Sequence, residues 1–123
     1  MSLLDTTLQE IAESFQLPGL SFNRNGVAGL RVGETDLVSI ERREDTVLLS
    51  VARPLPLHRQ KLAEKAMRLC GNEGGLPFPA RAGLTKDNKL VFLCRFSERE
   101  FILSEALRCI TALREAHSRV TQL

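Results

Sequence analysis

Hydrophobic and polar positions change period along the chain, and the first period is helical. From 3 to 15 the apolar residues recur every three to four positions, which predicts an amphipathic helix with one apolar stripe. Ser2 and Asp5 have the spacing of an N-terminal cap pair. Leu17 precedes Pro18, and a residue before proline is disfavoured in helical conformation, so we expect the helix to end there.

The period then falls to two. Three alternating stretches, 27–32, 37–43 and 46–52, are separated by short turns, so no crossover helix fits between them and we expect an antiparallel meander. Asn25 and Gly26 form a dipeptide typical of a type I′ hairpin turn, because both residues tolerate positive φ.

The second half of the chain repeats the alternation of helix and strand. We expect a helix from 57 to 70, strands over 80–85 and 89–96, and a long helix from 98 to about 120. The predicted order is α-β-β-β-α-β-β-α, an α+β fold with three helices and an antiparallel sheet of about five strands. At 123 residues the chain, 1–123, is expected to form a single domain.

The stretch KLVFLCRFSEREF, from 89 to 101, is apolar on both faces of the predicted strand. Its two faces comprise Leu90, Phe92, Cys94 and Phe96 on one side and Val91 and Leu93 on the other. Such a strand normally lies inside a sheet that is covered on both sides. Ser97 and Glu100 have capping-box spacing, which predicts that a helix begins directly behind the strand.

Composition excludes several classes of protein. The net charge of +2, with 17 basic residues scattered among 15 acidic ones, indicates no nucleic-acid partner. No run approaches the roughly 18 apolar residues of a membrane span, and the N-terminus lacks a signal-peptide pattern. An odd number of cysteines without metal spacing favours reduced thiols, so we expect a protein of the cytoplasm.

Chemistry-bearing residues form no recognisable site. His58 and His117 fall on different predicted helices, and Cys70, Cys94 and Cys109 contain no CxxC or CxxH pair. We therefore predict no catalytic residue, no metal site and no cofactor. A small enzyme that depends on His58, His117 or Cys109 stays open as one alternative.

The order and spacing of several segments resemble a known family. These segments are the N-terminal helix followed by LPGLSFNRNGVAGLRV, then TVLLSVARPLPLHR, KAMRLC, LPFPARAGL and KLVFLCRFSEREF. Together they resemble the class I type III secretion chaperones, the CesT/Tir chaperone-like family, and within it the SycN-type chaperones. Members of that family are commonly acidic, whereas this chain has a pI near 8.6.

The resemblance implies a dimer in the bacterial cytoplasm that binds an extended N-terminal segment of a secreted protein without ATP. The partner in the dimer would be a second copy or a paralogous small chaperone, and the secreted protein an effector or the gatekeeper of the apparatus. Carried onto this chain, the dimer interface comprises Leu62, Ala66, Met67, Leu69, Leu76 and Phe78. The candidate residues for client binding are Leu4, Leu8, Ile11, Val91 and Leu93. A regulatory adaptor that sequesters a transcriptional activator or antiactivator is the other alternative.

Overall fold

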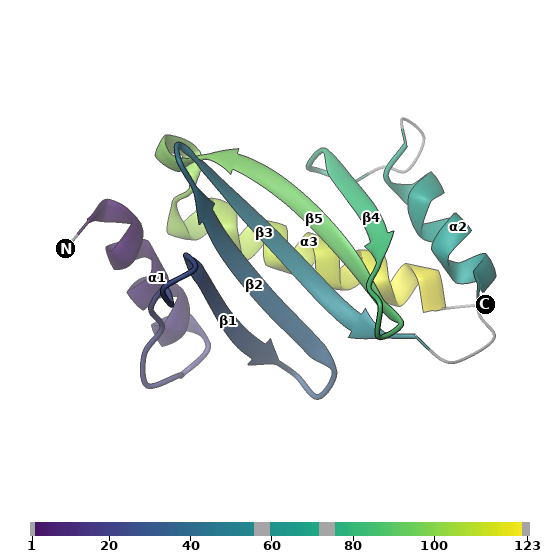
Figure 1. Cartoon of the computed structure of the whole chain (residues 1–123), viewed down its shortest axis with the longest axis horizontal. Coiled ribbons are helices and arrows are strands. Elements are labelled where there is room, and N and C mark those ends of the chain that lie inside the picture. Colours follow the sequence, from purple (N-terminus) through teal and green to yellow (C-terminus); the bar gives the residue numbers. More distant parts are fainter. Residues whose placement is uncertain (1, 56–59, 72–75, 122–123) are drawn as a thin grey trace.

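The structure is a computed structural model that describes residues 2–55, 60–71 and 76–121. Five antiparallel strands form one sheet in the order β1-β2-β3-β5-β4 (Figure 1). The strands are β1 Val27–Val32, β2 Asp36–Arg43, β3 Thr46–Pro54, β4 Ala80–Leu84 and β5 Lys89–Ser97. The helices are α1 Leu3–Ser14, α2 Gln60–Leu69 and α3 Leu103–Thr121, with the short 3₁₀ turn η1 Glu98–Glu100 before α3. The predicted order of elements and the α+β class are confirmed.

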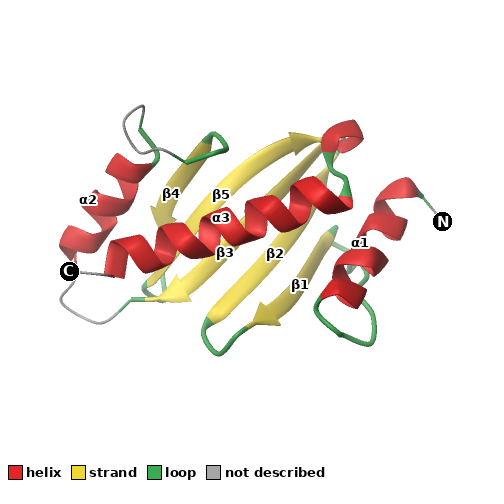
Figure 2. Cartoon of the chain, turned by 180° about the vertical axis from the view of Figure 1, so that it is seen from behind, coloured by secondary structure: helices red, strands yellow, loops and turns green. Residues whose placement is uncertain are grey.

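One helix covers a face of the sheet, and the other two lie beside its edge strands. Figure 2 shows α3 lying across the strands, with α1 beyond β1 and α2 beyond β4. Helix α3 contacts β3, β5, α1 and α2, so it connects the central strands with both of the other helices. In the described residues no helix lies over the opposite face of the sheet, which we call the open face (Figure 1).

The core lies between α3 and the sheet. Inward side chains of the central strands are almost completely buried, among them Ile40, Leu49, Val51, Leu90 and Phe92. Burial of such side chains contributes about 1.5–3 kcal/mol each relative to exposure. Strand β5 pairs with β3 on one side and β4 on the other, which confirms that it is an interior strand.

The first helix is capped as its sequence predicts. The Asp5 amide donates to Ser2 Oγ at 3.1 Å, and the Ser2 amide donates to Asp5 Oδ2 at 3.2 Å. This reciprocal pair satisfies two amides that a helix terminus leaves without partners. The predicted start of the second helix, at 57, falls outside the described residues; within them α2 begins at Gln60.

The predicted hairpin at Asn25 and Gly26 is wrong. Of the two residues only Gly26 has positive φ, at 75°, and the chain before it is not a strand. The side chain of Asn23 stabilises the turn instead, because its Oδ1 accepts from the amides of Asn25 and Val27 at 2.8 and 3.0 Å. The segment is therefore an Asn-stabilised turn that leads into β1.

The predicted capping box at Ser97 and Glu100 is also wrong. The two side chains bond each other at 2.7 Å, and Ser97 makes no side-chain cap to the backbone. The Glu98 amide donates to the Asp45 carbonyl, and Phe101 leaves helical conformation with ψ of 82°. The Phe101 ring is thereby buried at 5.4 Å from the Phe96 ring. Helix α3 consequently starts at Leu103, five residues later than expected at 98.

Candidate functional site

The open face carries an apolar centre that the chain itself does not cover. Its half-buried aliphatic side chains come from the three central strands and are Leu37, Leu48, Ala52, Val91 and Leu93. Val91 and Leu93 point away from the core, because they alternate with the buried Leu90, Phe92 and Cys94 along β5. An uncovered apolar sheet face is a surface on which another chain can pack.

The three α1 candidates lie elsewhere, within the core. Leu4, Leu8 and Ile11 are at most 2% exposed, so α1 uses them to hold itself against the rest of the fold. Leu4 also lines a pocket of about 400 Å³ beside Leu3 and Phe101, where the chain enters α3. Leu3 is 74% exposed there. The structure therefore does not bring the α1 candidates and the β5 candidates into one site.

The candidates for a dimer interface also divide into residues of the protomer core and residues that are at least partly exposed. Leu62 and Ala66 are 5% and 0% exposed and belong to the core of the protomer. Met67 lies on the outer side of α2 and is 56% exposed. The half-buried members of the set are Leu69, Leu76 and Phe78. Phe78 packs against the Phe96 ring at 5.7 Å, and Arg108 lies over it at 5.0 Å. Whether these residues form an interface stays a prediction.

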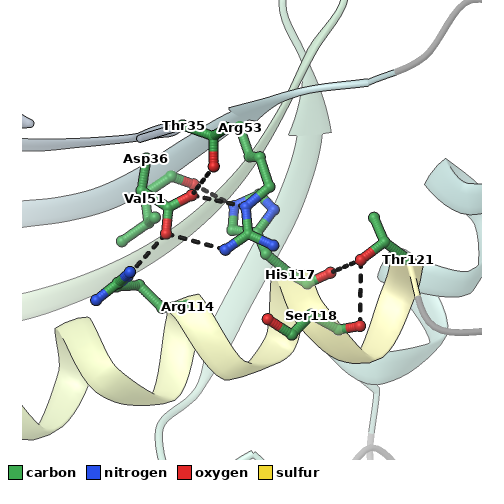
Figure 3. A network of polar contacts seen from close by, with 8 residues as sticks. All are labelled: Thr35, Asp36, Val51, Arg53, Arg114, His117, Ser118 and Thr121. Atoms are coloured by element: carbon green, nitrogen blue, oxygen red, sulfur yellow. Dashed lines mark hydrogen bonds and ion pairs between the residues drawn. The ribbon is translucent and has the colours of Figure 1, made fainter. Parts of the chain in front are cut away.

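An ionic cluster around the buried Asp36 joins β2, β3 and α3 (Figure 3). Asp36 is 1% exposed and accepts from Arg53 Nε and Nη2 at 2.6 and 2.9 Å. Arg114 Nε, on α3, donates at 2.7 Å to Asp36 Oδ2, the oxygen that also accepts from Arg53 Nη2. Burial by itself raises the pKa of Asp36, but the hydrogen bonds from both guanidinium groups outweigh burial and bring the pKa to about 2.

This cluster was not predicted from the sequence, although one signal was present. Asp36 has the same parity in β2 as the buried Val38 and Ile40, so an inward-facing charge could have been inferred. A buried charge requires partners, and the sequence does not say which cations would supply them. Asp36 contacts residues 17 and 78 positions away, so only the tertiary structure identifies them.

Residues with catalytic potential are used in packing. His117 lies 4.8 Å from the Phe92 ring and its Nε2 donates to the Val51 carbonyl at 2.7 Å (Figure 3). Burial lowers the pKa of His117. Cys94 and Cys109 are free thiols inside the core, and the hydrogen bond between them, together with burial, raises the pKa of Cys109. His58 lies outside the described residues.

No site for chemistry emerges from these groups. Among the described residues, no group of three His, Cys, Asp or Glu side chains could hold a metal ion. In the part of the chain that the structure describes, no helix is long and apolar enough to cross a membrane. The feature that remains is the open face, which suits binding.

Solved structures of type III secretion chaperones have the same fold. SchA, in the HopA1-SchA chaperone-effector complex, superposes with a TM-score of 0.69 at 16% identity, covering 96% of both chains. The heterodimeric ExoU-SpcU complex of Pseudomonas aeruginosa gives a TM-score of 0.68 at 19% identity, covering 92% of this chain and 93% of the other. The Yersinia pestis chaperone SycH, in complex with a fragment of YscM2, gives 0.67 at 14% identity, covering 94% and 98%. At such identities these structures establish the fold alone.

The family follows from the sequence of the whole chain. The family model of the type III secretory system chaperone SycN matches residues 4–121. The chain therefore belongs to the SycN family of type III secretion chaperones, and the alternative of a small enzyme is dropped. No curated protein sequence matches it significantly.

Proposed function

We propose that this chain binds an extended N-terminal segment of a secreted protein in the bacterial cytoplasm and keeps that segment competent for secretion. The observation that carries the proposal is the open face, whose apolar centre has no cover among the described residues. Membership of the SycN family supports it, as do complexes such as HopA1-SchA, in which a chaperone of the same fold is bound to an effector.

Binding of an extended segment agrees with the physical character of this surface. Val91 and Leu93 lie two residues apart on β5, and Ala52 and Ser50 lie opposite them on β3. The side chains of an extended segment alternate in the same way, so every second one would meet this apolar centre. No energy source is required, because burial of apolar area drives such binding.

We further propose that the working unit is a dimer with a second copy or a paralogous small chaperone, formed through the outer side of α2 and the segment after it. Met67 is the clearest anchor, because it is the most exposed of the six interface candidates. A stable dimer buries roughly 1,000 Å² or more in total. In the heterodimeric form the client would be the gatekeeper that plugs the secretion apparatus.

Affinity purification of the native chain under secreting and non-secreting conditions tests the function. We expect a secreted protein bound through its N-terminal segment, and loss of that capture when Val91 and Leu93 are both changed to Asp. Ile102→Asp is the matched control: Ile102 is 48% exposed, and it stands before α3, where aspartate is a favoured cap. Recovery of a transcriptional regulator in place of a secreted protein, or of neither, would contradict the proposal.

A further inference from the structure

Strands β3, β5 and β4 form a pocket of about 390 Å³ on the open face, at the end where β4 begins. The residues that line it are Leu48, Pro79, Ala80, Arg81, Leu93 and Arg95. Strand pairing places Leu48 opposite Arg95, and Leu93 opposite Arg81. Aliphatic side chains and guanidinium-bearing side chains therefore alternate across three neighbouring strands.

The two arginines of this pocket are uncompensated within the described residues. Arg81 and Arg95 are both exposed, and their guanidinium groups have no ion pair or hydrogen-bond partner there. They are diagonal neighbours on adjacent strands, and the Cα atoms of such neighbours are about 7–8 Å apart. Both guanidinium groups can therefore reach one carboxylate placed between them. The acid on the adjoining part of the face, Glu41, is already bound to Arg43 at 2.7 Å.

The backbone beside this pocket is open on one side. Pairing between β4 and β5 stops at Ala80 and Cys94, whereas β5 stays paired with β3 as far as Ser97. Residues 95–97 of β5 thus extend past the start of β4, and Pro79, which precedes that start, has no amide hydrogen to donate. Phe78 packs against Phe96 on the core side of this step, so a bound extended segment would lie over the open face beside residues 95–97.

We propose that this pocket binds an acidic side chain of the client segment, held between Arg81 and Arg95, with a neighbouring aliphatic side chain against Leu48 and Leu93. This assignment rests on the proposed chaperone function and names the chemistry that the open face selects. The occupant is an extended segment in which aliphatic and acidic residues alternate.

Two short synthetic peptides test the proposal on the full chain. One alternates leucine with glutamate, and the other carries glutamine at every glutamate position. Binding is followed through the backbone amide signals of the chain in solution NMR spectra. We expect the wild-type chain to bind the glutamate peptide about fivefold more tightly than the glutamine peptide, since two exposed charge-assisted contacts are gained. The preference should decrease as salt is raised from about 0.05 to 0.5 M.

Variants test whether the preference for the glutamate peptide depends on the two arginines of the pocket. The double variant R81Q/R95Q should lose the preference for glutamate, whereas R31Q should keep it. Arg31 is the matched control, since it is exposed on the same face but stands on β1 at the far edge of the sheet. All three arginines are exposed, so the variants should fold, and the dispersion of the amide signals verifies this. The comparison of the two peptides on the wild-type chain needs no variant at all.

Three results with the peptides would overturn the assignment. These are equal affinity of the wild-type chain for both peptides, a glutamate preference that persists in R81Q/R95Q, and signal changes confined to β1. Self-association that R81Q/R95Q abolishes, without any peptide, would assign the pocket to a second copy and also overturn it. If only the assignment of the pocket is wrong, the R81Q/R95Q variant captures the secreted protein as well as the wild-type chain does. Failure of the chaperone function shows instead as no capture by the wild-type chain.

Discussion

The Asp36 cluster allows one prediction to be developed quantitatively. Replacing Asp36 by asparagine preserves the size of the side chain but removes the negative charge that Arg53 and Arg114 share. The new amide group would also direct its hydrogens at guanidinium groups that can only donate. The substitution therefore converts a satisfied buried carboxylate into a site with cations that have lost their counter-charge.

Two considerations give the magnitude. A pKa of about 2, against 3.8 in the unfolded chain, corresponds to about 2.5 kcal/mol of stabilisation at neutral pH. Breaking a fully buried pair typically costs about 3–5 kcal/mol. The side chains of Arg53 and Arg114 are 20% and 38% exposed, so water replaces part of the lost interaction. We expect D36N to lower the free energy of unfolding by about 2–3 kcal/mol, or Tm by about 10 °C.

Denaturant unfolding at a fixed protein concentration measures this effect, and its pH dependence provides a second readout. The folded pKa of Asp36 is lowered, so its contribution is complete above a pH of about 4 and is lost as the pH falls toward 2. By pH 3 the difference between wild type and D36N should have shrunk by about 1 kcal/mol.

Glu115→Gln is the control, because Glu115 is exposed on the same helix as Arg114. Its effect should stay within about 0.5 kcal/mol at every pH. A D36N effect below about 0.5 kcal/mol, or one of the same size at pH 7 and pH 3, would refute the reasoning.

Three further variants address packing, the buried histidine and the proposed dimer. Phe101→Ala should cost about 3–5 kcal/mol of unfolding free energy in denaturant titration, since its ring is 2% exposed; a cost under 1 kcal/mol would contradict the packing. The folded pKa of His117 is lowered, so its contribution is present above 6.5 and is lost as the pH falls below that value. H117Q should flatten that part of the stability profile, and an unchanged slope would count against the assignment. Met67→Asp should weaken the dimer in light scattering at micromolar concentration; L62D cannot test this, because Leu62 is a core residue. Unchanged dimerisation of M67D would refute the interface.

Most of the fold was predictable from local patterns. The periods of two and 3.6 located the helices and strands, and the Ser2–Asp5 cap was confirmed at the first helix. Such patterns depend on residues within a few positions of one another, so the sequence alone contains them. The division of β5 into two alternating apolar faces was correctly predicted for the same reason.

Two local patterns were wrong because other groups bind the backbone amides in those segments. The Ser97 box fails because the Asp45 carbonyl takes the Glu98 amide, and because Phe101 is buried only if the chain leaves helical conformation. The Asn25–Gly26 dipeptide fails as a hairpin because the segment before it has no strand to pair with β1. At Ser97 a long-range contact outweighs a capping preference of about 1 kcal/mol or less, whereas at Asn25 and Gly26 the nearby Asn23 side chain stabilises a different turn.

The candidate site also has features that local sequence patterns determine and features that long-range contacts determine. The sequence determined that β5 has two apolar faces, because side chains alternate strictly along a strand. Only the tertiary structure decided which face α3 covers, which cations neutralise Asp36, and that Arg81 and Arg95 meet at one pocket. These outcomes depend on strand order and on the position of a helix, and both are set by contacts between residues far apart in the chain.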